Sequence, residues 1–153
     1  MTRKLAIIAI VLWVLSALVA GVMFVRGNGQ QGTDGRIVIH LAPVERDFVL
    51  SEMRGMLIAV QDISAALAKA DPESAAQAAR TAGSNSIGGV PVSLMTKLPL
   101  EFKQTGMSMH GSFDEFANAA NRGESERLLT GRLSNLLGNC VACHQAYRID
   151  PTE

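Results

Sequence analysis

The sequence predicts an all-α protein: an antiparallel four-helix bundle preceded by an N-terminal transmembrane helix. Residues 5–25 form an apolar run without a charge, and the rest of the 153-residue chain carries apolar residues at helical spacing in four successive stretches. Proline, glycine and asparagine residues separate these stretches, so the connections between them are short. Four amphipathic helices with short connections bury their apolar faces most economically as a bundle.

The first segment (residues 5–25, LAIIAIVLWVLSALVAGVMFV) is long enough to cross a membrane. As a helix it spans roughly 30 Å, the thickness of the hydrocarbon core of a bilayer. A signal peptide has a shorter apolar core followed by a cleavage site between small residues. The best such site, Val19-Ala20-Gly21, lies inside the run. We therefore expect residues 1–26 to be an uncleaved membrane anchor, with a cleaved signal segment as the alternative.

The rest of the chain divides into two further parts. Residues 27–42 are expected to be a flexible tether, rich in glycine and glutamine, followed by an extended segment that has no second strand nearby. Residues 43–153 are expected to form the bundle. Its helices are predicted from residue 43 to the Asp71-Pro72 pair and over residues 72–81, 99–121 and 124–147, with an additional turn at 92–97.

The residues that indicate a chemistry lie near the C-terminus, in Cys140-Val141-Ala142-Cys143-His144. Two cysteines three residues apart, with a histidine directly after the second, form the attachment pattern of a c-type haem. Each thiol can add to one vinyl group of the porphyrin, and His144 can then serve as the proximal ligand of the iron. The sequence therefore predicts one haem c, bonded covalently through Cys140 and Cys143.

Other interpretations of the cysteine pair are weaker. A C-x-x-C pair also occurs in dithiol–disulfide redox proteins, and this alternative stays open. A zinc site is disfavoured because zinc takes four ligands and the chain has no further cysteine. We see no serine–histidine–acid spacing and no phosphate-binding glycine loop, so we do not expect an enzyme. The formal net charge of zero gives no indication of nucleic-acid binding.

The segment from Cys140 to Arg148 (CVACHQAYR) resembles the C-terminus of the cytochrome c′ family, in which Tyr-Arg or Tyr-Lys follows the haem motif after two residues. The similarity extends, at the level of helix order, from about residue 43 to Arg148. The resemblance implies a left-handed four-helix bundle, one covalent haem, a periplasmic location and frequent homodimers. Members of the family usually have a cleaved signal peptide, whereas this chain has the pattern of an anchor.

The sixth ligand of the iron would decide the function. In the low-spin branch of the family a methionine from the first bundle helix ligates the iron, and the protein carries electrons. In the high-spin branch an apolar side chain leaves the iron five-coordinate, and the site binds NO or CO. Met53 is the expected distal ligand, with Met56 one turn further along, although methionine also commonly fills gaps in a core. His110 is a weaker candidate that we expect to be exposed.

Two residues that follow the motif, Tyr147 and Arg148, are expected to contribute to the haem site. Tyr147 is expected to pack on the haem edge, or else to close the apolar stripe of the last helix. Arg148 is expected to compensate the charge of a haem propionate, or else to interact with the helix dipole. Connectivity alone places the end of the last helix beside the starts of the first and third, so the haem neighbours are expected to include Phe48, Val49, Glu52, Met53, Met56 and residues 98–102.

The leading hypothesis is a membrane-anchored monohaem cytochrome that exchanges electrons with a membrane-associated redox partner protein. Arg3 and Lys4 precede the apolar run and Arg26 follows it, so the haem domain should face the periplasm from a single-pass anchor in a bacterial inner membrane. With a cleaved segment the protein would instead be free in the periplasm. The alternative function is an NO- or CO-binding haem protein with a five-coordinate iron.

Overall fold

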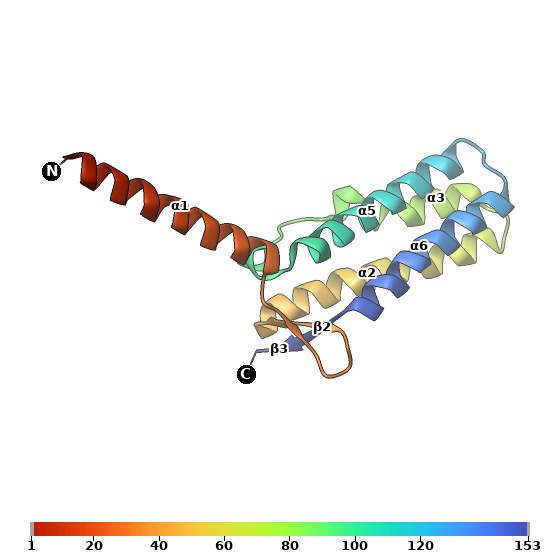
Figure 1. The fold of residues 1–153 in the computed structure, drawn as a ribbon. Helices are drawn as coiled ribbons and strands as arrows, with labels where there is room; N and C mark the ends of the chain where they lie inside the picture. The colour runs from red at the N-terminus through yellow and green to blue at the C-terminus, as the bar shows by residue number, and fades with distance from the viewer. Residues whose placement is uncertain (1, 153) are drawn as a thin grey trace.

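The computed structural model describes residues 2–152 and begins with one long helix. This helix, α1 (Thr2–Arg26), is apolar on all sides, and no part of its apolar span from Arg3 to Arg26 is buried against the rest of the chain. Figure 1 shows it projecting from one end of the remaining structure. By length and composition it can cross a membrane, which confirms the expected apolar N-terminal helix.

The rest of the described chain is mainly helical, as predicted. The helices are α2 (Pro43–Leu67), α3 (Pro72–Arg80), the short 3₁₀ helix η1 (Ser84–Ser86), α4 (Val92–Lys97), α5 (Leu100–Asn121) and α6 (Glu126–Ala146). α2 contacts α3 and α6, while α5 also contacts both α3 and α6. We call the part formed by these elements the helical domain.

The start of each early helix follows from local sequence. Pro43 stands at the first position of α2, where its missing N–H leaves no hydrogen bond unmade. Asp71 precedes α3, and its carboxylate accepts a hydrogen bond of 3.0 Å from the Ser74 N–H. An aspartate in this capping position satisfies one of the unpaired donors of the first turn.

Two apolar clusters fill the helical domain. The first lies among α2, α3, α5 and α6, and Ile63, Phe113 and Leu129 are completely buried in it. The alanines of α3 contribute only small side chains to this cluster, so α3 can approach α2 and α5 closely. The second cluster lies at the opposite end of α6 and includes Val49 and Phe102, with Cys143 at its margin.

A small sheet lies beside the second cluster. Its strands are β1 (Gly29–Gln31), β2 (Ile37–Leu41) and β3 (Tyr147–Pro151), with β2 in the centre. β1 and β2 are antiparallel, whereas β2 and β3 are parallel, with Ile37 opposite Tyr147 and Leu41 opposite Pro151.

This sheet corrects two sequence-based expectations. The segment 36–41 was expected to have no second strand nearby, but its main partner comes from the other end of the chain. The last helix ends at Ala146, so Tyr147 belongs to β3 and does not extend the apolar stripe of α6. Both differences have one cause: strand pairing supplies the backbone of residues 147–151 with hydrogen bonds that a longer helix would otherwise make.

The segment that was expected to be a flexible tether is in contact with the helical domain. Gly27 has a φ of +56°, and a Cβ atom at this position would lie only 2.3 Å from the carbonyl oxygen of Lys97. Only glycine fits such a site. The next residue, Asn28, donates its backbone N–H to the same oxygen at 2.6 Å. α1 therefore joins the domain through a close backbone contact, and β1 follows directly.

Glu45 connects the start of α2 to α4. The side chain is buried, and its carboxylate accepts hydrogen bonds from Lys97 Nζ at 2.7 Å, from the Ser93 hydroxyl at 3.0 Å and from the Ala42 N–H at 3.1 Å. The hydrogen bond from Lys97 is the main reason that the pKa of Glu45 lies below its usual value.

We expect Glu45→Ala to lower the free energy of unfolding by about 1–3 kcal/mol, because Lys97 and Ser93 lose their shared acceptor. Urea denaturation in detergent at pH 7, followed by circular dichroism, measures the difference. Asp47→Ala is the matched control, since the Asp47 side chain is 76% exposed and should change stability little.

The same pair of variants has a predicted pH dependence. Folding lowers the pKa of Glu45, so its contribution is complete above the unfolded-state value of 4.5 and is lost as the pH falls below it. The destabilisation caused by Glu45→Ala should therefore be smaller at about pH 3 than at pH 7. An equal effect at both pH values would show that the charge of Glu45 is not what stabilises the junction.

Candidate functional site

The two cysteines lie on the last turns of α6, on one face of the helix. They are three residues apart, which is the spacing of neighbours on a helix surface. Both are free thiols and both are half-buried. His144 follows Cys143 directly and is exposed, and α6 ends two residues later at Ala146.

Cys140, Cys143 and His144 line an almost wholly apolar cavity of about 480 Å³. α2 contributes Met53 and Met56 to its walls, and α5 contributes Phe102 and Met109. A cavity of this volume lies within the usual range for sites that hold small molecules and cofactors. The methionines can adapt their shape to a bound group because their side chains are unbranched and flexible.

A smaller cavity of about 180 Å³ adjoins the large one on the side of the sheet. Met53, Phe102, Cys143 and His144 line both cavities. The smaller cavity is also lined by Arg36, Tyr147 and Arg148, which come from the sheet and the residue before it. His144 therefore lies between apolar side chains of the helices and the guanidinium groups of two arginines.

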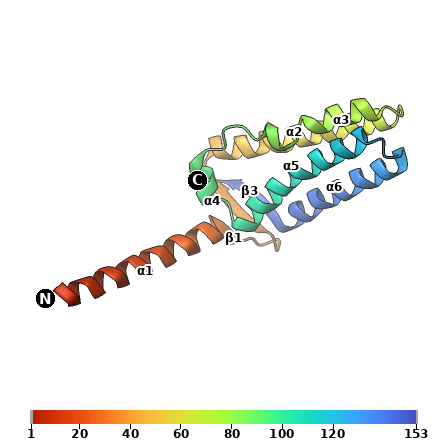
Figure 2. The same cartoon turned by 90° about the horizontal axis from the view of Figure 1, so that it is seen from above.

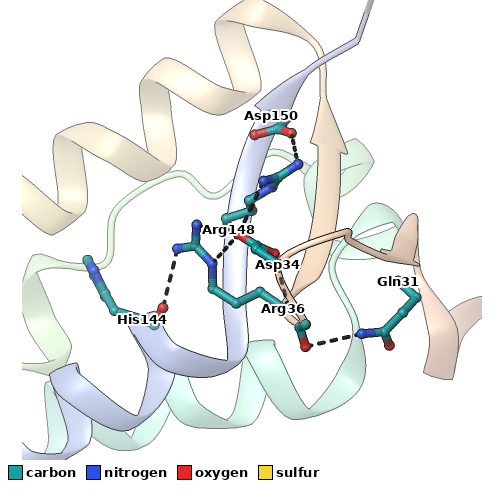
Figure 3. Close-up of polar contacts among 7 residues, drawn as sticks. Gln31, Asp34, Arg36, His144, Arg148 and Asp150 are labelled. Atoms are coloured by element: carbon teal, nitrogen blue, oxygen red, sulfur yellow. Dashed lines mark hydrogen bonds and ion pairs between the residues drawn. The ribbon is translucent and has the colours of Figure 1, made fainter.

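Figure 3 shows the polar contacts around these arginines. Arg36 Nη1 donates a hydrogen bond of 3.5 Å to the backbone carbonyl of His144. The Asp34 carboxylate accepts from Arg36 Nε at 2.9 Å and from Arg148 Nη1 at 3.2 Å. The hydrogen bond from Arg36 is the largest of the effects that lower the pKa of Asp34 to about 2. Asp34 is thus ionised at neutral pH and holds the two arginines together.

One of the N–H groups of Arg148 lacks a hydrogen-bond acceptor within the described part of the chain. One of its terminal nitrogens, Nη2, forms an ion pair with Asp150 at 3.1 Å, while its Nε is buried and has no hydrogen-bond partner among residues 2–152. A buried donor without an acceptor is unfavourable. An anionic group bound in the smaller cavity could supply the missing acceptor, as expected for a haem propionate.

Tyr147 packs at the junction of α6 and the sheet. Its ring meets the Phe102 ring edge-on, with 5.3 Å between the centroids and 85° between the planes. Its hydroxyl donates a hydrogen bond of 3.3 Å to the Glu101 carboxylate. Burial, followed by the nearby negative charge of Glu101, raises the pKa of Tyr147. The tyrosine thus forms part of the wall of the smaller cavity in its neutral form.

The electrostatics of the two thiols disfavour a dithiol redox centre. Burial is the largest cause of a raised pKa at both Cys140 and Cys143. Redox-active cysteines in C-x-x-C motifs instead have lowered pKa values, because the thiolate is the reactive form. Both thiols are therefore protonated at neutral pH and suited to an apolar surrounding.

Most of the residues expected beside the end of the last helix do lie around the same cavity. From α2 and the start of α5 these are Phe48, Val49, Glu52, Met53, Met56, Leu98 and Phe102. Met53 and Met56 are half-buried, and Met53 is the one that also lines the smaller cavity with His144. These side chains therefore share a cavity with Cys140, Cys143 and His144, and their contact with a haem stays a prediction.

His110 differs from its expected place. It was expected to be exposed, but it is buried, with 6% of its surface exposed, and it lines the large cavity. Its Nδ1 lies 2.9 Å from the carbonyl oxygen of Ala82. Because a carbonyl oxygen only accepts, Nδ1 is the donor in this hydrogen bond.

A helical pattern in the sequence could have revealed the burial of His110. It stands three residues before Phe113 and seven before Ala117, both of which are buried, so it belongs to the same apolar stripe of α5. The histidine adds a polar ring to a cavity that is otherwise almost wholly apolar.

The residues around the two cavities fit a c-type haem by their chemistry. Two thiols and an adjacent imidazole come from α6, the cavity is apolar, and a buried arginine nitrogen lacks an acceptor. Within residues 2–152 there is no cluster of three or more His, Cys, Asp or Glu side chains that could hold a metal ion directly.

No protein-family model, curated protein or solved structure matches the chain.

The raised thiol pKa values lead to a prediction for protein produced without haem maturation. Cys140 and Cys143 should react with iodoacetamide at pH 8 several-fold more slowly in the folded protein than in urea, because burial keeps them protonated. Mass spectrometry over time measures both rates, and free cysteine at each urea concentration corrects for the solvent. Faster reaction in the folded state would favour the alternative that Cys140 and Cys143 form a dithiol–disulfide redox centre.

Proposed function

We propose that this chain is a membrane-anchored monohaem c-type cytochrome that carries electrons. The single observation on which the proposal rests is that Cys140, Cys143 and His144 together line an almost wholly apolar cavity that also receives Met53 from α2. The thiol and imidazole groups that attach a c-type haem thus lie where an apolar macrocycle could be removed from water.

In this proposal each residue has a separate task. Cys140 and Cys143 would hold the porphyrin by adding their S–H groups across its two vinyl groups, and His144 would ligate the iron. Met53, or Met56 one turn further on, would offer its thioether sulfur to the iron as a second protein ligand. When bound, the haem supplies an iron centre that gains and loses one electron. Methionine ligation raises its reduction potential, which suits an electron carrier.

The sheet supports this arrangement by limiting the motion of the backbone near His144. Arg36 donates to the His144 carbonyl, and Tyr147 is paired with Ile37 in the parallel ladder. Arg148 holds its unpartnered Nε beside the same residue, where we assign it to a propionate. The arginines beside the sheet would then pair with the propionates, and the apolar side chains of the helices would surround the macrocycle.

The cytochrome c′ interpretation is part of the proposal. It assigns α2, α3, α5 and α6 to an antiparallel four-helix bundle with the haem motif at the end of its last helix. The contacts of α2 and α5 with both α3 and α6 support that assignment. The three-stranded sheet is an addition that the resemblance does not imply. The resemblance also leads us to expect a homodimer.

The location follows from the anchor. We infer that α1 crosses a bacterial inner membrane once and that the haem domain faces the periplasm, the side on which bacteria attach c-type haem. A tether of this kind raises the effective concentration of the carrier near membrane-associated redox partners.

A five-coordinate, gas-binding haem protein is the second candidate function. It is favoured by the apolar side chains Val49 and Leu50, which line the large cavity on the same helix as Met53. If one of these side chains covered the iron in place of a methionine, the sixth position would stay open to NO or CO.

Haem attachment is tested on full-length protein from a host that matures c-type cytochromes. The intact protein should gain the mass of one haem, and its haem should resist extraction by acid and organic solvent because it is held by covalent bonds. The Cys140→Ser/Cys143→Ser double variant should lack the added mass. Matured wild-type protein that consists only of bare polypeptide would refute the proposal.

The sixth ligand is tested by substitution. If Met53 ligates the iron, Met53→Ala should convert a low-spin ferric spectrum into a high-spin one and remove the methionine–iron charge-transfer band in the near infrared. Met107→Ala is the matched control, because Met107 lines the same cavity but is 60% exposed.

The outcomes separate the two candidate functions. An unchanged low-spin spectrum in Met53→Ala would remove Met53 as the ligand. A wild-type spectrum that is already high-spin and shifts when CO is added to the ferrous protein would favour the gas-binding alternative.

A further inference from the structure

A buried lysine connects α1 to the helical domain. Lys103, with only 7% of its surface exposed, donates hydrogen bonds from Nζ to the carbonyl oxygens of Phe24 at 3.2 Å and of Met95 at 3.0 Å. The same nitrogen lies 3.6 Å from the centre of the Phe24 ring, which adds a cation–π contact. The last turn of α1 is thereby held against α4 and α5.

The backbone directly after α1, at Gly27 and Asn28, also lies in close contact with the helical domain. Gly27 leaves no room for a Cβ atom against Lys97, and Asn28 donates to the carbonyl of the same residue. Figures 1 and 2 show α1 projecting from the end of the helical domain where α4 and the sheet also lie. No flexible spacer separates α1 from this end.

This end of the domain exposes large apolar side chains. Val44 is 82% exposed and Val92 is 81% exposed, the highest values for large apolar residues in the part of the chain that the structure describes. Met95, at 37%, lies one turn after Val92 on α4. Val44 is beside α4, because its neighbour Glu45 accepts hydrogen bonds from Ser93 and Lys97.

We propose that this patch, formed by Val44, Val92 and Met95, rests on the surface of the lipid bilayer that α1 crosses. α1 ends at Arg26, whose charge belongs at the level of the lipid headgroups. Because α4 contacts α1, and Met95 on α4 is joined to Phe24 through Lys103, α4 must lie near the same level. Apolar side chains that would be unfavourable in water are stabilised when they enter the boundary between headgroups and acyl chains.

The orientation of the helical domain on the bilayer restricts where an electron-transfer partner can bind, and this step rests on the proposed function. Lys103 and Met95, which contact each other at the end of α1, both line the large cavity. The proposed haem site therefore extends to the end of the domain that faces the membrane. Its electron-transfer partner is then a protein or carrier embedded in the same membrane, in preference to one that is free in the aqueous compartment.

Photo-crosslinking to lipid tests the bilayer contact. The full-length protein is reconstituted into vesicles of phosphatidylethanolamine and phosphatidylglycerol with p-benzoylphenylalanine at position 44 or 92, and lipid adducts are counted by mass spectrometry. Position 128 is the matched control, because Leu128 is 51% exposed at the start of α6, at the end of the domain away from α1. Position 13, within α1, reports whether the anchor is inserted.

The expected result is that lipid adducts at positions 44 and 92 exceed those at position 128 by at least about fivefold, with adducts at position 13 as well. Equal yields at positions 92 and 128 would overturn the proposal, as would the absence of adducts at position 13. The Cys140→Ser/Cys143→Ser background should give the same pattern. A failure of haem attachment is therefore distinguishable from a failure of the bilayer contact.

Discussion

Backbone hydrogen bonds between β2 and β3 join two segments from opposite ends of the chain, and the arrangement around His144 depends on them. β3 begins directly after α6, so the pairing of Tyr147 with Ile37 determines where that helix ends. The same pairing brings Arg36 to the His144 carbonyl and Asp34 to Arg148. A shift of one residue in the register would turn Tyr147 to the other face of the strand, away from Phe102.

The helical domain is filled unequally along its length. At one end, alanine, phenylalanine and leucine side chains form a close-packed core, as is usual in protein interiors. At the other end, the side chains line an apolar cavity of about 480 Å³ that is open to solvent on one side. Free thiols and methionine side chains therefore line the less closely packed end of the domain.

The junction with α1 links the anchor to the proposed site. Lys103 contacts the last turn of α1 through Phe24 and lines the large cavity on its other side. A buried ammonium group is costly unless its hydrogen bonds are made, and here two backbone carbonyls and an aromatic ring satisfy it. α1, the cavity and the sheet thus meet at one end of the domain, and Lys103 is common to the junction and the cavity.

The sequence by itself determined the helices, the apolar N-terminal segment and the spacing of Cys140, Cys143 and His144. These features depend on helical periodicity, on proline and aspartate at helix starts and on residue order, all of which are local. Only the tertiary structure decided the pairing of β2 with β3, the hydrogen bond between His110 and the Ala82 carbonyl and the contact of Lys103 with Phe24. Each of these contacts joins residues that are distant in the sequence. Its free energy depends on how the whole chain packs, so local composition does not predict it.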